Sequence, residues 1–344
     1  MKISTAILVI VMSVGISSLL AQTDCSQSLL NAERAYYTGR FDDVQTMLAP
    51  CLTSGFDKDQ KTEAYRLLAL SNIFSRNFEM ADSALFLMLK TTPQYEVSAQ
   101  DPPEFRKRLD KFNARPIVSI SLGGGAYLPM MRITKVYNLR NTPSDVKYKS
   151  SLGYQFAVGT SFFLSKKVVL EAALEWQSFA FTINNSSDIK DSKGERVETR
   201  LEEAQKRNQV MLAAGYNFSL GAVTMRVSGG AAYNTLMKAE GSLYRLELVS
   251  GDYVYREDLG FSNLNHRTRH DLRPLILVKA SIPQKNNYAI DFFMRYEYGI
   301  RNLSRNRDAD VTQMLRYEWV EDDFKASYLT LGVSLSKLYY HVKQ

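Results

Sequence analysis

The chain has 344 residues, enough for two domains; 45% are hydrophobic and 23% are charged. This balance excludes a disordered protein, and beyond the N-terminus no run approaches the roughly 20 apolar residues of a membrane-spanning helix. The net charge of +7 comes from scattered basic residues rather than one basic face. We therefore expect no nucleic-acid partner, and two cysteines with three histidines give little material for a metal or another cofactor.

Residues 1–21 are predicted to be a signal peptide. Lys2 supplies the positive start, an apolar stretch runs to Leu20, and Ala21 is a small residue suited to cleavage before Gln22. An uncleaved anchor is the alternative, disfavoured because the apolar run is short and polar residues follow at once. The sequence thus predicts an exported protein.

Residues 22–113 are predicted to form a helical domain, because apolar residues recur there at three- and four-residue spacing. The domain contains a repeat, in which residues 36–42 match residues 73–79 at an offset of 37. Each copy predicts a helix end, a tight turn and a Phe that starts the next helix; the turn residues are Gly39, Phe41 and Phe78. Tetratricopeptide (TPR-like) repeats have a similar period of about 34 residues. An unrelated pair of helical hairpins remains the alternative.

Cys25 and Cys51 lie near the start of the first predicted helix and the end of the second. These ends are neighbours in an antiparallel hairpin, and an exported protein meets an oxidising compartment. We expect a Cys25–Cys51 disulfide that stabilises the hairpin by roughly 3 kcal/mol. Two free thiols are the alternative.

From residue 114 to residue 344 the apolar period changes from about 3.6 to 2, which is typical of strands. Eight alternating runs predict eight antiparallel strands, centred on residues 118–123, 153–162, 170–176, 209–218, 223–228, 276–282, 288–301 and 329–336. A tilted strand of about ten residues crosses a bilayer, and aromatic residues near its ends fit the interfacial girdles of membrane barrels. The sequence predicts an eight-stranded transmembrane β-barrel.

Short and long connections between these strands alternate. The short ones lie near residues 165–167, 219–221 and 283–286, and the long polar ones at 129–150, 184–206, 238–272 and 302–326. In outer-membrane barrels the short turns are periplasmic and the long loops are outside. The first strand would therefore start on the periplasmic side, which places the helical domain in the periplasm.

The polar face of the predicted strands carries acids and bases in equal number. They are Glu171, Glu175, Asp291 and Glu297 with Arg226, Lys279, Arg295 and Arg301. Because an unpaired buried charge is costly, we expect a paired, closed lumen rather than an open pore. A soluble barrel or sandwich, which buries the apolar face instead, is the alternative.

The chain resembles the outer-membrane barrel proteins of Bacteroidetes that carry a periplasmic TPR-like domain. The resemblance rests on residues 37–42, the helix at 64–69, the break at 101–105 and the barrel from Pro116 onward. It implies outer-membrane lipid around the barrel and an envelope protein as partner of the helical domain. Relatives in this group include accessory proteins of type IX secretion and gliding.

We therefore expect no enzyme but a barrel that anchors a periplasmic interaction module for envelope assembly or type IX secretion. One alternative is a surface-loop adhesin or ligand receptor. A lipid-modifying barrel enzyme is the other, for which His266, His270 and His341 are the candidate bases. Gly123, Gly124 and Gly125 lack the following helix that a phosphate-binding loop needs.

Overall fold

A computed structural model describes residues 25–98, 101–136, 144–190, 196–221, 223–249, 252–262, 264, 266–304 and 322–344. The predicted signal peptide at 1–21 lies outside these residues. The chain divides into two compact units, which are described in turn. One consists of Met1–Pro116 with Tyr339–Gln344, and the other of Ile117–Leu338.

The first unit is built of helical hairpins. Its helices are residues 25–37, α2 (Phe41–Thr53), α3 (Lys58–Phe74), α4 (Phe78–Thr91) and α5 (Pro103–Leu109). The helices bury Ala and Leu side chains such as Ala35, Leu48, Leu67 and Leu85 in one common core. Asp57 and Gln60 form a capping box at the start of α3, which satisfies two amide groups that the helix itself leaves unpaired. A disulfide joins Cys25 and Cys51, as the sequence predicts.

The two matching turns have the same backbone structure. Gly39 and Arg76 stand at equivalent positions of the repeat, and both have a left-handed φ, +77° and +61°. In each turn two amides donate back to the preceding helix: Gly39 and Arg40 to Tyr36 and Ala35, and Arg76 and Asn77 to Ile73 and Asn72. This is the hydrogen-bond pattern of a Schellman helix end. The sequence repeat is therefore a repeat of structure.

The last residues of the chain belong to the helical unit. Val342 is buried in the helical core together with Phe112, and the Tyr340 hydroxyl accepts a hydrogen bond from the Gln94 side-chain amide. The sequence places residues 339–344 at the end of the barrel only. The packing of these residues in the helical unit was not predicted, because a segment of six residues is too short to show a periodic pattern.

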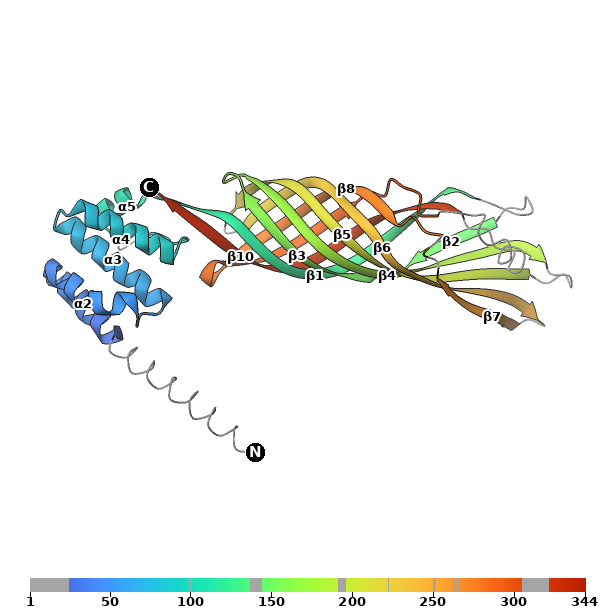
Figure 1. Ribbon diagram of the computed structural model, residues 1–344, viewed down its shortest axis with the longest axis horizontal. Helices are drawn as coiled ribbons and strands as arrows, with labels where there is room; N and C mark the ends of the chain where they lie inside the picture. Colours follow the sequence, from blue (N-terminus) through green and yellow to red (C-terminus); the bar gives the residue numbers. More distant parts are fainter. Residues whose placement is uncertain are drawn as a thin grey trace, which may run out of the picture. The chain divides into compact units, whose positions relative to one another are not determined.

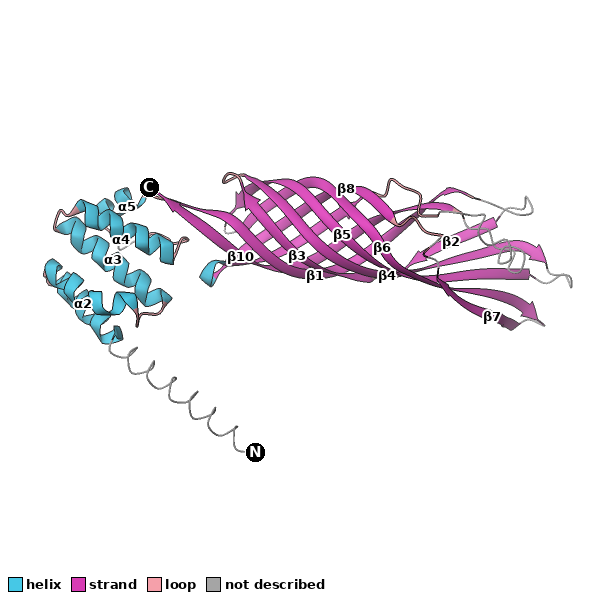
Figure 2. Ribbon diagram, in the orientation of Figure 1, coloured by secondary structure: helices cyan, strands magenta, loops and turns pink. Residues whose placement is uncertain are grey.

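The second unit is a β-barrel (Figure 1). Ten described strands form one sheet, and eight of them close into an antiparallel ring in the order β1-β3-β4-β5-β6-β8-β9-β10. The ring strands are β1 (Asn113–Lys135), β3 (Gly153–Phe163), β4 (Val168–Lys190), β5 (Arg196–Leu220), β6 (Val223–Val249), β8 (His270–Gln284), β9 (Tyr288–Glu297) and β10 (Asp323–Lys343). β2 (Ser144–Ser150) pairs with β4, and β7 (Asp252–Ser262) pairs with β6. Both lie at one end of the barrel; the 3-10 turn η1 (Lys285–Asn287) lies at the other (Figure 2).

The outer face of the ring carries a band of exposed apolar side chains. Ile120, Leu174, Leu212, Ile276 and Leu331, on five different strands, are each at least half exposed. Their neighbours in sequence point inward, because successive strand residues alternate between faces. The inward set includes Ser119, Ser121 and Glu175, so the polar face is the buried one. A water-soluble sandwich has the opposite arrangement, and this structure therefore excludes that alternative.

Beyond this band the two faces exchange character. On β4 the inward residues change from Glu171 and Glu175 to Phe179, Phe181 and Ile183, while the outward residues change from Leu174 to polar Ser178 and Thr182. The inward residues form a second core with Tyr127, Leu201, Leu243, Leu303, Phe324 and Tyr328. An apolar inside with a polar outside is the pattern of a strand in water. The barrel thus continues past the apolar band as a water-facing extension.

This extension corrects the prediction of long loops. Much of 184–206 and 238–272 is strand: β4 and β5 pair as far as Lys190 and Arg196, and β6 continues to Val249. Several charged residues of these segments, among them Arg200, Glu202 and Lys206, lie on the outer face of paired strands, so their polarity does not indicate a loop. Residues 305–321, most of the fourth predicted loop, lie outside the described residues. Among the described helices, none is long and apolar enough to cross a membrane.

Candidate functional site

The interior of the barrel holds paired charges in successive levels. At the level nearest the short turns, Glu171 accepts from Arg226 and lies 3.4 Å from the Lys279 ammonium. The Arg226 Nε also donates to the Asn217 amide oxygen at 2.7 Å. Because both partners are buried and hydrogen-bonded, the cost of removing these charges from water is offset.

The middle level is a network that crosses the barrel. The Arg295 guanidinium binds both carboxylate oxygens of Glu175 and lies 2.9 Å from Glu297. Gln209 donates to Glu175 at 3.0 Å and to Glu297 at 2.9 Å. Arg273 joins the same network, 3.2 Å from Glu297. Side chains from β4, β5, β8 and β9 thus meet in the lumen, which ties opposite walls together.

The upper level combines an ion pair with aromatic rings. Arg267 binds the Glu203 carboxylate with its Nε at 2.9 Å, and neither side chain is exposed to solvent. The Arg273 guanidinium lies 3.9 Å from the centre of the Tyr328 ring, and Arg207 faces the same ring at 5.9 Å. Arginine stacks well on aromatic faces because its charge is delocalised and weakly hydrated. This level closes the barrel below the water-facing extension.

A small cavity lies between the levels of charge inside the barrel. A cavity of about 50 Å³ lies between the lower and middle levels, lined by Ser121, Gly159, Glu175, Met211, Lys279 and Arg295 among others. A water molecule needs roughly 10–15 Å³ of such volume, so the cavity is large enough for only a few waters. Gly332 lies on the inward face of β10, in contact with the Phe293 ring. A side chain at this position would clash with that ring. Small residues here let Phe293 fill the lumen.

Seven of the eight predicted lumen charges point into the barrel. Glu171, Arg226 and Lys279 meet at the lower level, and Glu175, Arg295 and Glu297 at the middle level. Asp291 is also buried, but it accepts from the hydroxyls of Ser334 and Ser336 rather than from a base.

Arg301 is a correction to the predicted network. It is exposed, and its guanidinium donates to the backbone oxygen of His270 at 3.1 Å. β9 ends at Glu297, so the alternation that placed Arg301 inside was extended beyond the strand. The prediction also missed Glu203, Arg207, Arg267, Asp271 and Arg273, most of which lie in segments assigned to loops. The alternation of Asp271, Arg273, Leu275 and Leu277 along β8 is the signal that could have found two of them.

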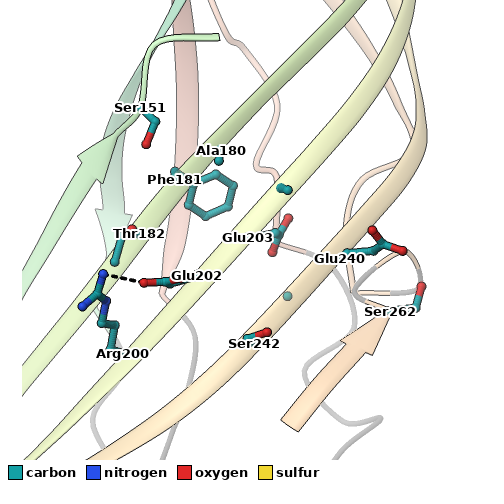
Figure 3. A pocket seen from close by; sticks show the side chains of 12 residues that line it. Ser151, Ala180, Phe181, Thr182, Arg200, Glu202, Glu203, Glu240, Ser242 and Ser262 are labelled. Carbon is teal, nitrogen blue, oxygen red and sulfur yellow. Dashed lines mark ion pairs between the residues drawn. The ribbon is translucent and has the colours of Figure 1, made fainter. Parts of the chain in front are cut away.

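The water-facing extension contains a pocket of 740 Å³ (Figure 3). It is lined by hydroxyl groups, including those of Ser151, Thr182 and Ser242, and by Glu202, Glu203 and Glu240. Figure 3 shows Arg200 paired with Glu202 at its edge. Glu203 is paired with Arg267 and Glu240 with Lys238, so the acids of the pocket are largely neutralised. A polar, uncharged ligand fits this lining better than a cation.

The histidines considered for an enzyme have other surroundings. The His270 ring stacks on Tyr233 with centroids 5.8 Å apart, and the Tyr233 hydroxyl lies 3.0 Å from its Nδ1. His341 belongs to the C-terminal segment of the helical unit. A nucleophile–base–carboxylate arrangement around His270 is not among the described contacts. The described residues also contain no group of three metal-binding side chains.

Among known proteins, the chain is similar only to proteins of solved structure. No protein-family model matches the chain, and no curated protein is similar to it. The outer membrane protein OprG from Pseudomonas aeruginosa is 9% identical, with 64% of this chain and 96% of that chain covered and a TM-score of 0.36. A major outer membrane protein from Thermus thermophilus is 13% identical, with 64% and 99% covered and a TM-score of 0.33. These values are low, and they assign no function to this chain.

Proposed function

We propose that this chain is an outer-membrane protein whose closed barrel anchors a periplasmic helical domain that binds another envelope protein. The proposed membrane location is supported by the apolar outer band of the ring and the paired charges inside it. Only a lipid environment makes an apolar outer face and a polar interior favourable in the same ring. The role is that of an accessory in envelope assembly or type IX secretion.

Orientation supports a periplasmic helical domain. The ring is joined at one end by tight connections, at Leu164–Lys167, around Gly221 and at η1, and at the other by long hairpins that extend into the water-facing part. Outer-membrane barrels keep their short turns in the periplasm. β1 leaves the helical unit on the side of the short turns, so the helical domain has the periplasm as its compartment.

An exposed aromatic cluster marks the partner surface that we propose on the helical unit. Tyr36, Tyr37, Phe41 and Phe74 come from the two repeated turns, with the Phe41 and Phe74 rings stacked 5.5 Å apart. Tyr37 is 74% exposed and Phe74 49%. Exposed aromatic groups of this kind are enriched where proteins bind each other. Stacked helical hairpins commonly present such surfaces, as the TPR-like interpretation implies.

Cross-linking in envelopes tests the partner. The full chain carrying Tyr37→Ser and Phe74→Ser is expected to lose a protein that wild type retains in pull-down after cross-linking. Val97→Ser is the matched control, because Val97 is 42% exposed and lies outside the aromatic cluster. Retention of every partner by the double variant contradicts this surface. Fractionation tests the anchor: the protein is expected in the outer membrane, and recovery in the soluble periplasm contradicts it.

A second function, a ligand receptor at the cell surface, is favoured by the pocket of the extension. Its lining combines Ser and Thr hydroxyls with apolar groups such as Phe181 and Ala180, which suits a neutral ligand with polar and apolar faces, such as a sugar. Surface binding of glycans by cells expressing wild type, compared with cells expressing Ser242→Leu, separates the two functions. Equal binding by both contradicts a receptor role for this pocket.

A further inference from the structure

Two basic residues lie opposite each other on the outer wall of the barrel, just beyond its apolar band. On β1 and β10, Gly123 lies against Ser334 and Gly125 against Gly332, and the Thr134 hydroxyl donates to the Asp323 backbone oxygen. This register of two antiparallel strands places Lys325 directly opposite Arg132. Both side chains alternate with inward residues and therefore face outward.

Among the described carboxylates, none lies within ion-pair distance of this pair. In the part of the chain that the structure describes, neither Arg132 nor Lys325 forms an ion pair. Like charges directly opposite on neighbouring strands destabilise a sheet, so the arrangement is unfavourable unless an anion lies between them. By contrast, two outward bases on the wall of β5 and β6 have acids: Arg200 pairs with Glu202 and Lys238 with Glu240.

Tyr298 completes the charged patch. The Arg132 guanidinium donates to the Tyr298 hydroxyl at 3.0 Å and lies 5.6 Å from the centre of its ring. Tyr298 follows β9, so the hydrogen bond spans β10 and holds the guanidinium over the same strand that carries Lys325. An arginine fixed in this way keeps further N–H donors for a phosphate oxygen.

An apolar groove runs along the same wall, farther into the apolar band. It is formed by side chains of β6, β8, β9 and β10, among them Val278, Phe292, Met294, Leu331 and Val333. Leu331 follows Lys325 by six residues, about 20 Å along a strand at roughly 3.3 Å per residue. That is comparable to one leaflet of a bilayer whose hydrocarbon core is about 30 Å thick. A charged site and an apolar groove at this separation match a lipid, with its headgroup and its acyl chain.

We propose that Arg132, Lys325 and Tyr298 bind the phosphate of an anionic lipid headgroup, with an acyl chain of the same lipid in the groove of β8, β9 and β10. The lipid belongs to the leaflet on the side of the barrel's water-facing extension. This inference rests on the membrane position proposed above. One side of the barrel would then bind a specific lipid, whereas the remaining outer face contacts bulk lipid.

Native mass spectrometry of the full-length protein in detergent tests the site. The probes are lipid A with two phosphates and the same lipid with both phosphates removed. We expect the phosphorylated lipid to bind the wild type at least fivefold more tightly, since each basic residue near a lipid surface contributes about 1 kcal/mol. Arg132→Gln and Lys325→Gln are each expected to weaken that binding about fivefold. Inorganic phosphate alone is expected not to displace the lipid; displacement would overturn a lipid site.

The matched control removes the same charge from the other wall. Lys206 and Lys238 also lie opposite each other, on β5 and β6, but Lys238 is paired with Glu240. The Lys206→Gln/Lys238→Gln protein is expected to bind phosphorylated lipid as wild type does. An equal loss in this control would overturn the proposal, because the effect would then be one of overall charge.

A second variant separates binding from folding. Arg132→Glu places an acid opposite Lys325, so the barrel is expected to melt no earlier than wild type in detergent while losing its preference for phosphorylated lipid. A retained preference overturns the site. Flotation with phosphatidylcholine vesicles distinguishes the two proposals: a wild type that fails to insert overturns both, whereas one that inserts without lipid preference overturns the lipid site alone.

Discussion

One residue in each of the two repeated turns has a left-handed backbone conformation. Gly39 and Arg76 occupy the same left-handed position in their turns, yet only glycine adopts this conformation without a steric cost. At Arg76 the backbone amide still completes the same hydrogen bonds. The second turn is therefore formed at the expense of some strain, which a substitution can remove.

Arg76→Gly is expected to raise the free energy of unfolding of the helical unit by about 0.5–1 kcal/mol, because it relieves the left-handed strain. Urea unfolding followed by helical circular dichroism at constant pH measures the change. Arg40→Gly is the control: Arg40 has a φ of −85°, so glycine there only adds freedom to the unfolded chain. A lower stability for Arg76→Gly would contradict the strain at this turn.

Asp101 organises the base of the helical unit through one buried carboxylate. Arg66 binds Asp101 at 2.7 Å, and the Tyr95 hydroxyl donates to it at 3.0 Å. Burial, and next the negative charge of Asp101, raise the pKa of Tyr95 from 10.0 to about 12. Because the folded state holds this proton more tightly than the unfolded chain, the stabilisation is complete below pH 10 and is lost as the pH rises through 12.

The helical unit is thus expected to lose stability between pH 10 and pH 12. For Tyr95 the loss is on the order of 1 kcal/mol, reduced from the full two-unit value because the ring is only half buried. Tyr95→Phe should show a shallower decline over this range in chemical unfolding monitored at 222 nm. A decline as steep as that of wild type would mean that Tyr95 does not contribute.

At the scale of whole elements, the sequence predicts some features well and others poorly. The alternation of Tyr296 and Arg295 along β9, and the tight turns at residues 165–167 and 283–286, predict the ring because both faces are chemically distinct there. The strands beyond the band were predicted as loops, because at residues such as Arg200 and Glu202 the outer face is charged. Alternation alone does not show which face of a strand is buried where the surroundings change from lipid to water. It also does not show where a strand ends, and for this reason Arg301 was wrongly placed in the lumen.

The disulfide holds the first two helices as one element. Cys25 and Cys51, 26 residues apart in sequence, are both buried beside the hairpin core. Cys25→Ala/Cys51→Ala is expected to lower the stability of the helical unit by roughly 3 kcal/mol. The barrel, which has no cysteine, is expected to melt unchanged. Separate melting of the two units, followed by their helix and strand signals, checks this; a barrel transition that also moves would contradict it.

For the molecule as a whole, the levels of paired charge support the proposed role of the barrel as an anchor rather than a channel. Each level closes the lumen with its own partners: Glu171 with Arg226, Glu175 with Arg295, and Glu203 with Arg267. Ions cross a barrel only through continuous water, and the cavity described between the lower and middle levels, about 50 Å³, is too small to form such a path. Closure therefore does not depend on any single level.

Planar-bilayer recordings are accordingly expected to show no steady conductance for the wild type. Glu203→Ala/Arg267→Ala removes both partners of the upper-level ion pair together, which avoids leaving an unpaired buried charge. It should remain closed, because the network of Glu175 and Arg295 still fills the middle level. Steady current through this variant would show that the upper level alone seals the barrel, whereas current through the wild type would contradict the anchoring role. Insertion is confirmed in the same preparation by protection of the barrel from protease.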